Sequence, residues 1–261
     1  MLEACPKLKL ICVMATGYNV VDTAAARARG VTVCNIPAYS TAAVAQMTAA
    51  LLLELTNHVA LHDRSVHRGD WTACPDFCYW VRPLTELQGH TLGIIGYGRI
   101  GRAFGAVARA LGMELLVYAR HRREEPEDPG FRYASSMEKV FREADVISLH
   151  CPLTPETEKL INRDTLGMMR PGALLLNTSR GGLLDEAAVA EALRSGRLAG
   201  AAVDVVSEEP IREDNPLLSA PNCVITPHIA WAPEETRARL MDIGRENIRA
   251  FLAGRSRNVV N

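Results

Sequence analysis

The sequence predicts an α/β protein built on a doubly wound parallel sheet, with a second, smaller unit made from the two ends of the chain. Two features indicate this fold. Short apolar runs alternate with helix-like segments along nearly the whole 261-residue chain, which is typical of parallel strands connected by helices. A glycine motif also stands between one apolar run and the helix-like segment after it. About half of the residues are apolar, so the chain can bury a sizeable core.

The first part of the chain predicts strands over residues 8–15 and 31–34, with a helix over 20–29 that ends at Gly30. A long helix over 41–57 is too apolar for a surface helix, so we expect it between packed layers. Residues 68–87 are irregular and rich in aromatic side chains, namely Trp71, Phe77, Tyr79 and Trp80. Such an excursion covers a site or a subunit interface, or it packs on its own core.

The pattern becomes regular after residue 90. Strands are predicted over six short apolar runs: 91–95, 114–118, 146–150, 173–177, 201–205 and 223–226. Helices are predicted between them over 99–111, 136–142, 156–166 and 186–195. Asp185 suits the N-cap of the last of these. A final helix over 234–252 follows Pro233, and Gly254 ends it.

The charge balance argues against several classes of partner. The net charge is −1, so the chain offers no basic field for a nucleic acid or an anionic membrane. No apolar run approaches the roughly 18 residues that a membrane span needs. Glu3 and Pro6 are unlike the start of a secretory signal. We therefore expect a cytoplasmic protein.

The cysteines and histidines do not predict a metal site. Seven cysteines, an odd number, fit reduced thiols better than a disulfide framework. Cys74 and Cys78 are close together, but no second pair follows them. His58 and His62 have the i, i+4 spacing of a helix surface, which is the simpler interpretation of this pair.

Gly96, Gly98 and Gly101 form the motif that follows the strand predicted over 91–95. Gly96 allows a tight turn, Gly98 lets the backbone approach a pyrophosphate, and Gly101 lets the helix pack on the strand. Arg99 and Ile100 complete the motif at the start of the helix, where unpaired N–H groups and the helix dipole favour phosphate. The alternative is a glycine-rich turn with no ligand, but the strand before it and the helix after it favour a dinucleotide site.

Arg180, Glu209 and His228 each follow a predicted strand. Because parallel strands point the same way, the three side chains lie at the carboxyl edge of the sheet, as the glycine loop does. Taken singly, each is more often structural or solvated. Together they suit reduction of a 2-keto acid: arginine binds a carboxylate, histidine donates a proton, and a carboxylate orients the imidazole.

At these residues the sequence resembles the D-isomer-specific 2-hydroxyacid dehydrogenases over essentially its whole length. The resemblance implies that Arg180 binds substrate, His228 is the acid/base and Glu209 is its partner. It implies that Asp204 binds the nicotinamide carboxamide. Thr16 and Gly17 match the loop whose N–H groups hold the substrate carboxylate. The other implied cofactor-lining residues are Cys151, Pro152, Thr157, Thr178 and Ser179.

Trp231 and the stretch 76–80 are most similar to the glycerate dehydrogenase, or hydroxypyruvate reductase, branch, so Trp231 is a further candidate substrate contact.

The resemblance implies a Rossmann cofactor domain over residues 39–229. It implies an incomplete flavodoxin-like substrate domain over 1–38 and 230–261, because an opening segment of roughly 60 residues lacks a counterpart here. A truncated reading frame and a natural fragment both remain open.

The cofactor choice depends on the end of the strand over 114–118. Members of the resembled family that use NAD place an acid there, whereas this chain has Ala119 followed by Arg120, Arg122 and Arg123. Guanidinium groups bind a 2′-phosphate, so we expect NADP rather than NAD. The alternative is a solvated basic turn offset by neighbouring glutamates.

The expected activity is hydride transfer between NAD(P)H and a small 2-keto or 2-hydroxy acid, with hydroxypyruvate or glyoxylate as the leading substrates. The resemblance also implies a homodimer. Two rival hypotheses are an inactive fragment, because missing strands leave an open sheet edge, and a nucleotide-sensing binding protein of the same fold.

Overall fold

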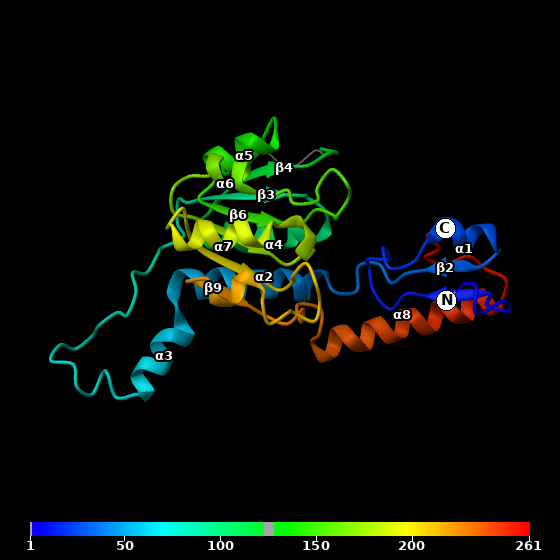
Figure 1. Ribbon diagram of the computed structural model, residues 1–261, viewed down its shortest axis with the longest axis horizontal. Helices are drawn as coiled ribbons and strands as arrows, with labels where there is room; N and C mark the ends of the chain where they lie inside the picture. The colour runs from blue at the N-terminus through cyan, green and yellow to red at the C-terminus, as the bar shows by residue number, and fades with distance from the viewer. Residues whose placement is uncertain (1, 123–127) are drawn as a thin grey trace. The chain divides into compact units, whose positions relative to one another are not determined.

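The computed structural model describes residues 2–122 and 128–261. The chain divides into two compact units (Figure 1). The smaller comprises Met1–Ala43 and Trp231–Asn261, and the larger comprises Val44–Ala230. The larger unit therefore contains the glycine loop and the three predicted catalytic residues.

The larger unit is built on a seven-stranded sheet whose neighbouring strands all run parallel. In spatial order the strands are β5 (Phe131–Tyr133), β4 (Glu114–Tyr118), β3 (Thr91–Ile95), β6 (Val146–Leu149), β7 (Ala173–Asn177), β8 (Leu198–Val203) and β9 (Cys223–Ile225). The chain winds outward from β3 in one direction and from β6 in the other. This reversal of strand order produces the crevice in which doubly wound sheets bind ligands. The predicted doubly wound fold is confirmed.

Helices cover both faces of this sheet. One face packs against α2 (Thr41–Asn57) and α4 (Arg99–Ala110). The other packs against α5 (Met137–Glu143), α6 (Arg163–Met168) and α7 (Glu186–Arg194). Neighbouring strand residues alternate between the two cores, as the period of a strand requires. Because both faces are buried, the strands are continuous apolar runs, which is why they were recognisable in the sequence.

A projecting arm follows α2. It consists of α3 (Val59–His67) and the irregular residues 68–87, and it reaches away from the sheet of its own unit (Figure 1). The Ser65 hydroxyl lies 2.5 Å from Asp70 Oδ2 and 2.9 Å from the Tyr79 hydroxyl. The Trp71 indole donates to the Phe77 carbonyl. The arm therefore has an ordered conformation held by its own hydrogen bonds.

The smaller unit contains two parallel strands, β1 (Leu10–Cys12) and β2 (Thr32–Cys34), with α1 (Thr23–Ala28) and α8 (Glu234–Leu252). The last residues of the chain run antiparallel beside β2: the Val260 N–H donates to Val33 O, and the Asn35 N–H donates to Asn258 O. The two ends of the chain thus build one unit.

The structure differs from several predicted elements. Strand β1 is only Leu10–Cys12 where residues 8–15 were expected, and β8 is Leu198–Val203 where 201–205 was expected. No helix begins at residue 156: Lys159 has φ 48°, and α6 begins only after Asn162, whose side chain accepts hydrogen bonds from the Asp164 and Thr165 N–H groups. Strand β5 was not predicted, because its three residues are too few to show a periodic pattern. The predicted Asp185 cap is present, with its carboxylate accepting from the Ala188 N–H.

Within the described ranges, no helix is long and apolar enough to cross a membrane. All seven cysteines are free thiols.

Candidate active site

The glycine loop connects β3 to α4 with very little steric freedom. Gly96 has φ 96°, in the left-handed region that favours glycine. A Cβ on Gly96 would lie 2.6 Å from the backbone of His150 and Cys151. A Cβ on Gly101 would overlap the Gly96 carbonyl oxygen. Both glycines are therefore required by close backbone packing.

Gly98 differs from these two because a Cβ there would meet nothing within 4 Å. Gly98 is the N-cap of α4, and it has no side chain to cap the first N–H groups of the helix. Uncapped N–H groups at a helix N-terminus bind phosphate oxygens. Open space above Gly98 and an uncapped helix of twelve residues thus fit the pyrophosphate of a dinucleotide.

The loop after β6 borders the same edge. The Thr157 hydroxyl donates to Pro152 O at 2.7 Å and accepts from the Thr154 N–H at 2.8 Å, which closes the loop into a compact turn. Burial lowers the pKa of His150 to about 4 and raises that of Cys151 to about 11. Both side chains are therefore uncharged near neutral pH.

Arg180 stands in a tight turn at the end of β7. The fully buried Asn177 side chain accepts from the Ser179 N–H and donates to the Arg180 carbonyl. The guanidinium donates to the Ser179 carbonyl at 2.6 Å, and it has no carboxylate partner in the part of the chain that is described. Thr178 is held by Thr48, with the two hydroxyls 2.9 Å apart. The turn thus holds an arginine whose charge is free to bind an anion.

His228 and Glu209 form the pair expected from the sequence. The His228 Nδ1 lies 2.6 Å from Glu209 Oε2, and both side chains are partly exposed, at 42% and 37%. The other Glu209 oxygen accepts from the Val206 N–H at 3.2 Å. A carboxylate on Nδ1 fixes the imidazole orientation and leaves Nε2 as the nitrogen that exchanges a proton.

Asp204 anchors the segment that carries His228. Its carboxylate is 1% exposed and accepts from the Thr226 hydroxyl and from the N–H groups of Ile229 and Ala230, at 2.5, 2.9 and 2.8 Å. These bonds hold His228 where its backbone has φ 54°, an uncommon conformation for a residue with a side chain. The contact of Asp204 with a nicotinamide carboxamide stays a prediction.

Glu186 is a positioning residue that sequence reasoning missed. At the start of α7 its two oxygens accept from the Ser207 N–H and hydroxyl, at 2.6 and 2.7 Å, and from Asn215 at 2.9 Å. Asn215 precedes the short helix η2 (Pro216–Ser219). These bonds hold the loop that presents Glu209. No local pattern marks them, because the partners are 21 and 29 residues from Glu186.

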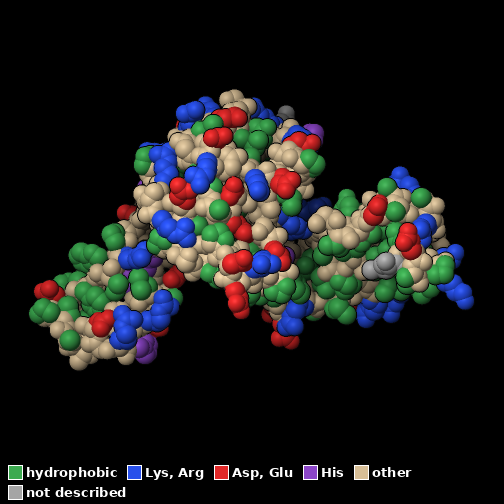
Figure 2. Space-filling model, viewed as in Figure 1, with side chains coloured by type: hydrophobic (Ala, Val, Ile, Leu, Met, Phe, Trp, Pro, Cys, Tyr) green, Lys and Arg blue, Asp and Glu red, His purple; other side chains and the backbone are tan. Residues whose placement is uncertain are grey.

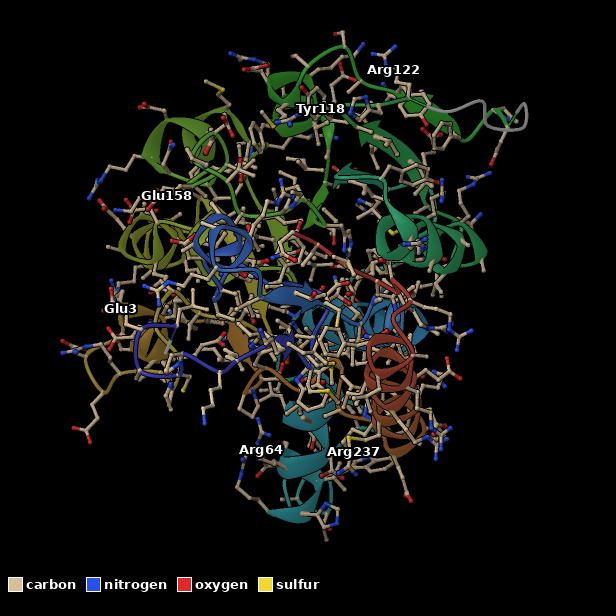
Figure 3. The ribbon with its side chains drawn as sticks, turned by 90° about the vertical axis from the view of Figure 1, so that its right-hand side faces the viewer. Glu3, Arg64, Tyr118, Arg122, Glu158 and Arg237 are labelled. Atoms are coloured by element: carbon tan, nitrogen blue, oxygen red, sulfur yellow. The ribbon has the colours of Figure 1, made fainter. Side chains whose placement is uncertain are left out.

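The basic turn after β4 has two different arginines. Arg122 donates to the Ala134 carbonyl at 2.8 Å, and its guanidinium lies 5.4 Å from the centre of the Tyr133 ring. Figure 3 marks Tyr118 at the end of β4 and Arg122 beyond it. Arg120 is exposed, and after the hydrogen bond from Thr154 its charge also lowers the pKa of Glu156. Arg123 lies outside the described residues.

The remaining predicted residues belong to the smaller unit. The Thr16 hydroxyl donates to Ile36 O, and the Asn35 side chain donates to Thr16 O. The N–H groups of Thr16 and Gly17 have no hydrogen-bond acceptor within the described ranges. Trp231 packs against the apolar cluster of Ile36, Tyr39, Leu240 and Ile243.

A glycine turn that fits a phosphate and a histidine–carboxylate pair at one edge of a doubly wound sheet are features typical of an NAD(P)-dependent oxidoreductase. Comparison with known proteins specifies the class further. The family model described as "D-isomer specific 2-hydroxyacid dehydrogenase, NAD binding domain" matches residues 49–230. The chain therefore belongs to the D-isomer-specific 2-hydroxyacid dehydrogenase family, and it is an NAD(P)-dependent oxidoreductase that acts on CH–OH donors.

Individual relatives agree with this assignment. A hydroxypyruvate reductase from Blautia hydrogenotrophica is 51% identical, over 99% of this chain and 80% of the relative. A glycerate dehydrogenase from Methylorubrum extorquens is 43% identical, over 99% of this chain and 81% of the relative. The crystal structure of an NADPH-dependent glyoxylate/hydroxypyruvate reductase from Sinorhizobium meliloti, in complex with NADP and malonate, superposes with a TM-score of 0.89. The two sequences are 33% identical, and the superposition covers 99% of this chain and 79% of the Sinorhizobium chain.

Proposed function

We propose that this enzyme reduces hydroxypyruvate or glyoxylate to the corresponding 2-hydroxy acid. The observation that carries the proposal is the 2.6 Å contact between His228 and Glu209, at the sheet edge that also holds the glycine loop. The names of the Blautia and Methylorubrum relatives support the choice of substrate. The proposal is tested by adding hydroxypyruvate or glyoxylate to the purified chain with the reduced cofactor and measuring cofactor oxidation. No oxidation of the cofactor with either substrate would refute the proposal.

In the proposed mechanism Arg180 binds the substrate carboxylate and the carbonyl oxygen through its planar guanidinium. The N–H groups of Thr16 and Gly17 are proposed as further donors to the carboxylate. The bound nicotinamide supplies the hydride. His228 gives the proton from Nε2 to the alkoxide oxygen, and the Glu209 carboxylate stabilises the imidazolium before that transfer. In the oxidative direction His228 takes the proton back.

We also propose that the enzyme prefers NADP. The end of β4 carries Ala119 in place of an acid, so no carboxylate at that position repels a 2′-phosphate. Arg120 is exposed and has no short ion pair within the described residues, although its charge acts on Glu156, whereas Arg122 is held by Ala134. Arg120 is therefore the first choice for the phosphate contact. The NADP complex of the Sinorhizobium relative supports this choice of cofactor.

The cofactor preference is expected to reverse in a double variant. Losing one charged hydrogen bond costs about 1.5–3 kcal/mol, or about 10- to 150-fold in affinity. Ala119→Asp with Arg120→Ala should therefore shift the ratio of kcat/KM for NADPH to that for NADH by at least tenfold toward NADH. Arg142→Ala, an exposed arginine on α5, is the matched control and should leave the ratio unchanged. An unmutated enzyme that prefers NADH tenfold would show that the basic turn is only a solvated surface.

The arm is proposed to form a homodimer with a second copy of this chain. Figure 2 shows hydrophobic side chains over α3 and the segment that follows it. Phe77 is 90% exposed, Trp80 68% and Val59 62%. Soluble monomers seldom display large contiguous apolar patches, and the arm does not bury these side chains against its own unit. A second copy supplies an identical arm, which makes a symmetric interface possible.

We expect the chain to sediment as a dimer at micromolar concentration. The double variant Phe77→Ser with Trp80→Ser should weaken dimerisation at least tenfold, because buried aromatic side chains dominate interface energies. Val107→Ser is the control, since Val107 is 38% exposed but lies on α4, away from the arm. A monomer at micromolar concentration, or equal effects of the two replacements, would contradict this interface.

The seven free thiols support a reducing compartment, for which we propose the cytoplasm.

A further inference from the structure

The loop at residues 15–17 is tied to the segment that follows β2 in the smaller unit. The Ile36 N–H donates to the Ala15 carbonyl at 3.0 Å. The Asn35 carboxamide donates from Nδ2 to the Thr16 carbonyl at 2.8 Å, and the Thr16 hydroxyl donates to the Ile36 carbonyl at 2.9 Å. Of the two donors that the anchoring segment supplies, only the one from Asn35 is a side chain, so a substitution outside the loop can remove it.

These bonds fix the directions of the two N–H groups that are proposed to hold the substrate carboxylate. A peptide group is planar and trans, so its C=O and its N–H point in opposite directions. The Ala15 carbonyl shares a peptide group with the Thr16 N–H, and the Thr16 carbonyl shares one with the Gly17 N–H. Neither N–H has an acceptor within the described ranges. Each N–H is therefore held in place from the opposite side of its peptide group and remains available to a ligand.

The bond from Asn35 also makes the Gly17 N–H a stronger donor. A hydrogen bond to a carbonyl oxygen polarises the peptide group, and bonds in series reinforce one another. Asn35 is only 8% exposed, and in such surroundings of low dielectric the polarisation is larger than in water. Asn35 thus acts on both the direction and the strength of this donor.

Asn35 is itself held by two further asparagines. Its N–H donates to the Asn258 carbonyl at 3.1 Å, and its carbonyl accepts from Asn247 Nδ2 at 2.9 Å. Asn247 lies on α8 and is 2% exposed, and its Oδ1 accepts from Asn258 Nδ2 at 2.9 Å. The carboxamides therefore form a series of hydrogen bonds that runs from Asn258 through Asn247 and Asn35 to the Thr16 carbonyl. This series gives the Asn35 side chain a fixed base.

We propose that Asn35 is a positioning residue for substrate binding, whose carboxamide orients the Gly17 N–H toward the substrate carboxylate. This role rests on the proposed function, in which the loop at residues 15–17 binds that carboxylate. The carboxylate carries the same charge in the bound substrate and in the transition state, so the loop stabilises both to the same extent. Loss of the Asn35 donor is therefore expected to raise KM and to leave kcat nearly unchanged.

Two replacements of Asn35 and one control separate this role from a purely structural one. Asn35→Leu keeps the branched shape of the side chain, whereas Asn35→Ala leaves its space open, and both remove the donor. Asn261→Leu is the matched control. The Asn261 side chain also binds the β2 segment, since it donates to Val31 O at 2.7 Å and accepts from the Val33 N–H at 2.8 Å. Its hydrogen bonds do not involve the loop at residues 15–17.

Steady-state kinetics with hydroxypyruvate measure KM and kcat separately. We expect KM to rise about tenfold in both Asn35 variants, because a hydrogen bond to a charged carboxylate is weakened. We expect kcat to change less than about twofold. Asn261→Leu should change KM less than about twofold. Three results would overturn the proposal: KM is unchanged in Asn35→Leu, KM rises equally in Asn261→Leu, or both Asn35 variants unfold while the control folds.

Binding of oxamate, an unreactive mimic of a 2-keto acid, distinguishes a failure of this role from a failure of the proposed function. Quenching of the fluorescence of the bound reduced cofactor measures the Kd of oxamate without turnover. If the chain does not reduce hydroxypyruvate but the Kd rises about tenfold in Asn35→Leu and not in Asn261→Leu, the role of Asn35 is supported and only the proposed substrate is wrong. If hydroxypyruvate is reduced and the Kd is the same with and without Asn35→Leu, only the role of Asn35 is wrong. A chain that neither reduces hydroxypyruvate nor binds oxamate would contradict both.

Discussion

Replacing His228 with alanine is expected to lower kcat for 2-keto acid reduction about 100-fold or more, with the Kd of the cofactor nearly unchanged. Glu209 lies 2.6 Å from His228 Nδ1, so Nε2 is the nitrogen that can meet the substrate oxygen. Removing the ring removes the proton donor for the alkoxide and leaves the glycine loop intact. Steady-state kinetics and a fluorescence titration of the reduced cofactor separate the two effects.

Two adjacent glutamates provide a matched control for this prediction. Glu209→Gln should lower kcat about tenfold or more, because the orienting carboxylate on Nδ1 is lost. Glu208→Gln should leave kcat unchanged, since Glu208 is exposed and faces Arg212 at 3.7 Å. Near-normal turnover by His228→Ala, or equal losses in the two glutamate variants, would show that this pair is not the acid/base of the reaction.

Replacing Gly181 with alanine should destabilise the chain by about 3 kcal/mol and also lower activity. Gly181 follows Arg180 and begins the short helix η1 (Gly181–Leu183). A Cβ on Gly181 would overlap the Val206 carbonyl and the Ser207 nitrogen. Because these are backbone atoms, rotation of a side chain cannot relieve the overlap. The turn that holds Arg180 or the loop that holds Glu209 must move.

Gly167→Ala is the control for this second prediction. Gly167 lies in α6, and a Cβ there would meet nothing within 4 Å. Alanine is the better helix former, so this replacement should leave stability unchanged or raise it by up to about 1 kcal/mol. Urea unfolding of both variants measures the difference. If Gly181→Ala unfolds at the same urea concentration as Gly167→Ala, the close packing between these two loops is wrong.

The parts of the fold that could be predicted are those with strong periodic patterns. Strands β3, β4 and β7 and helices α2 and α8 have the predicted bounds, because buried parallel strands and long helices repeat one pattern over many residues. The segment from residue 156 has helical composition, but the hydroxyl of Thr157 bonds to the Pro152 carbonyl instead. Local competition of this kind leaves no periodic signal.

The candidate site divides in the same way. The glycine loop could be predicted because the motif, the strand and the helix are contiguous. The anchoring of Asp204 by Thr226 and of Ser207 by Glu186 could not, because these bonds join distant segments. The different surroundings of Arg120 and Arg122 also depend on tertiary structure: Arg122 bonds to the residue after β5, and β5 itself was not predicted.

Isotope transfer from the cofactor to the product tests the central claim most directly. The purified chain is incubated with hydroxypyruvate and with NADPH that carries deuterium at C4 of the nicotinamide, each face being labelled in turn. The account predicts that one labelled face, and not the other, delivers deuterium to C2 of glycerate, and that this glycerate is the D-isomer. Glycerate without deuterium from either face, or deuterated L-glycerate, would contradict it.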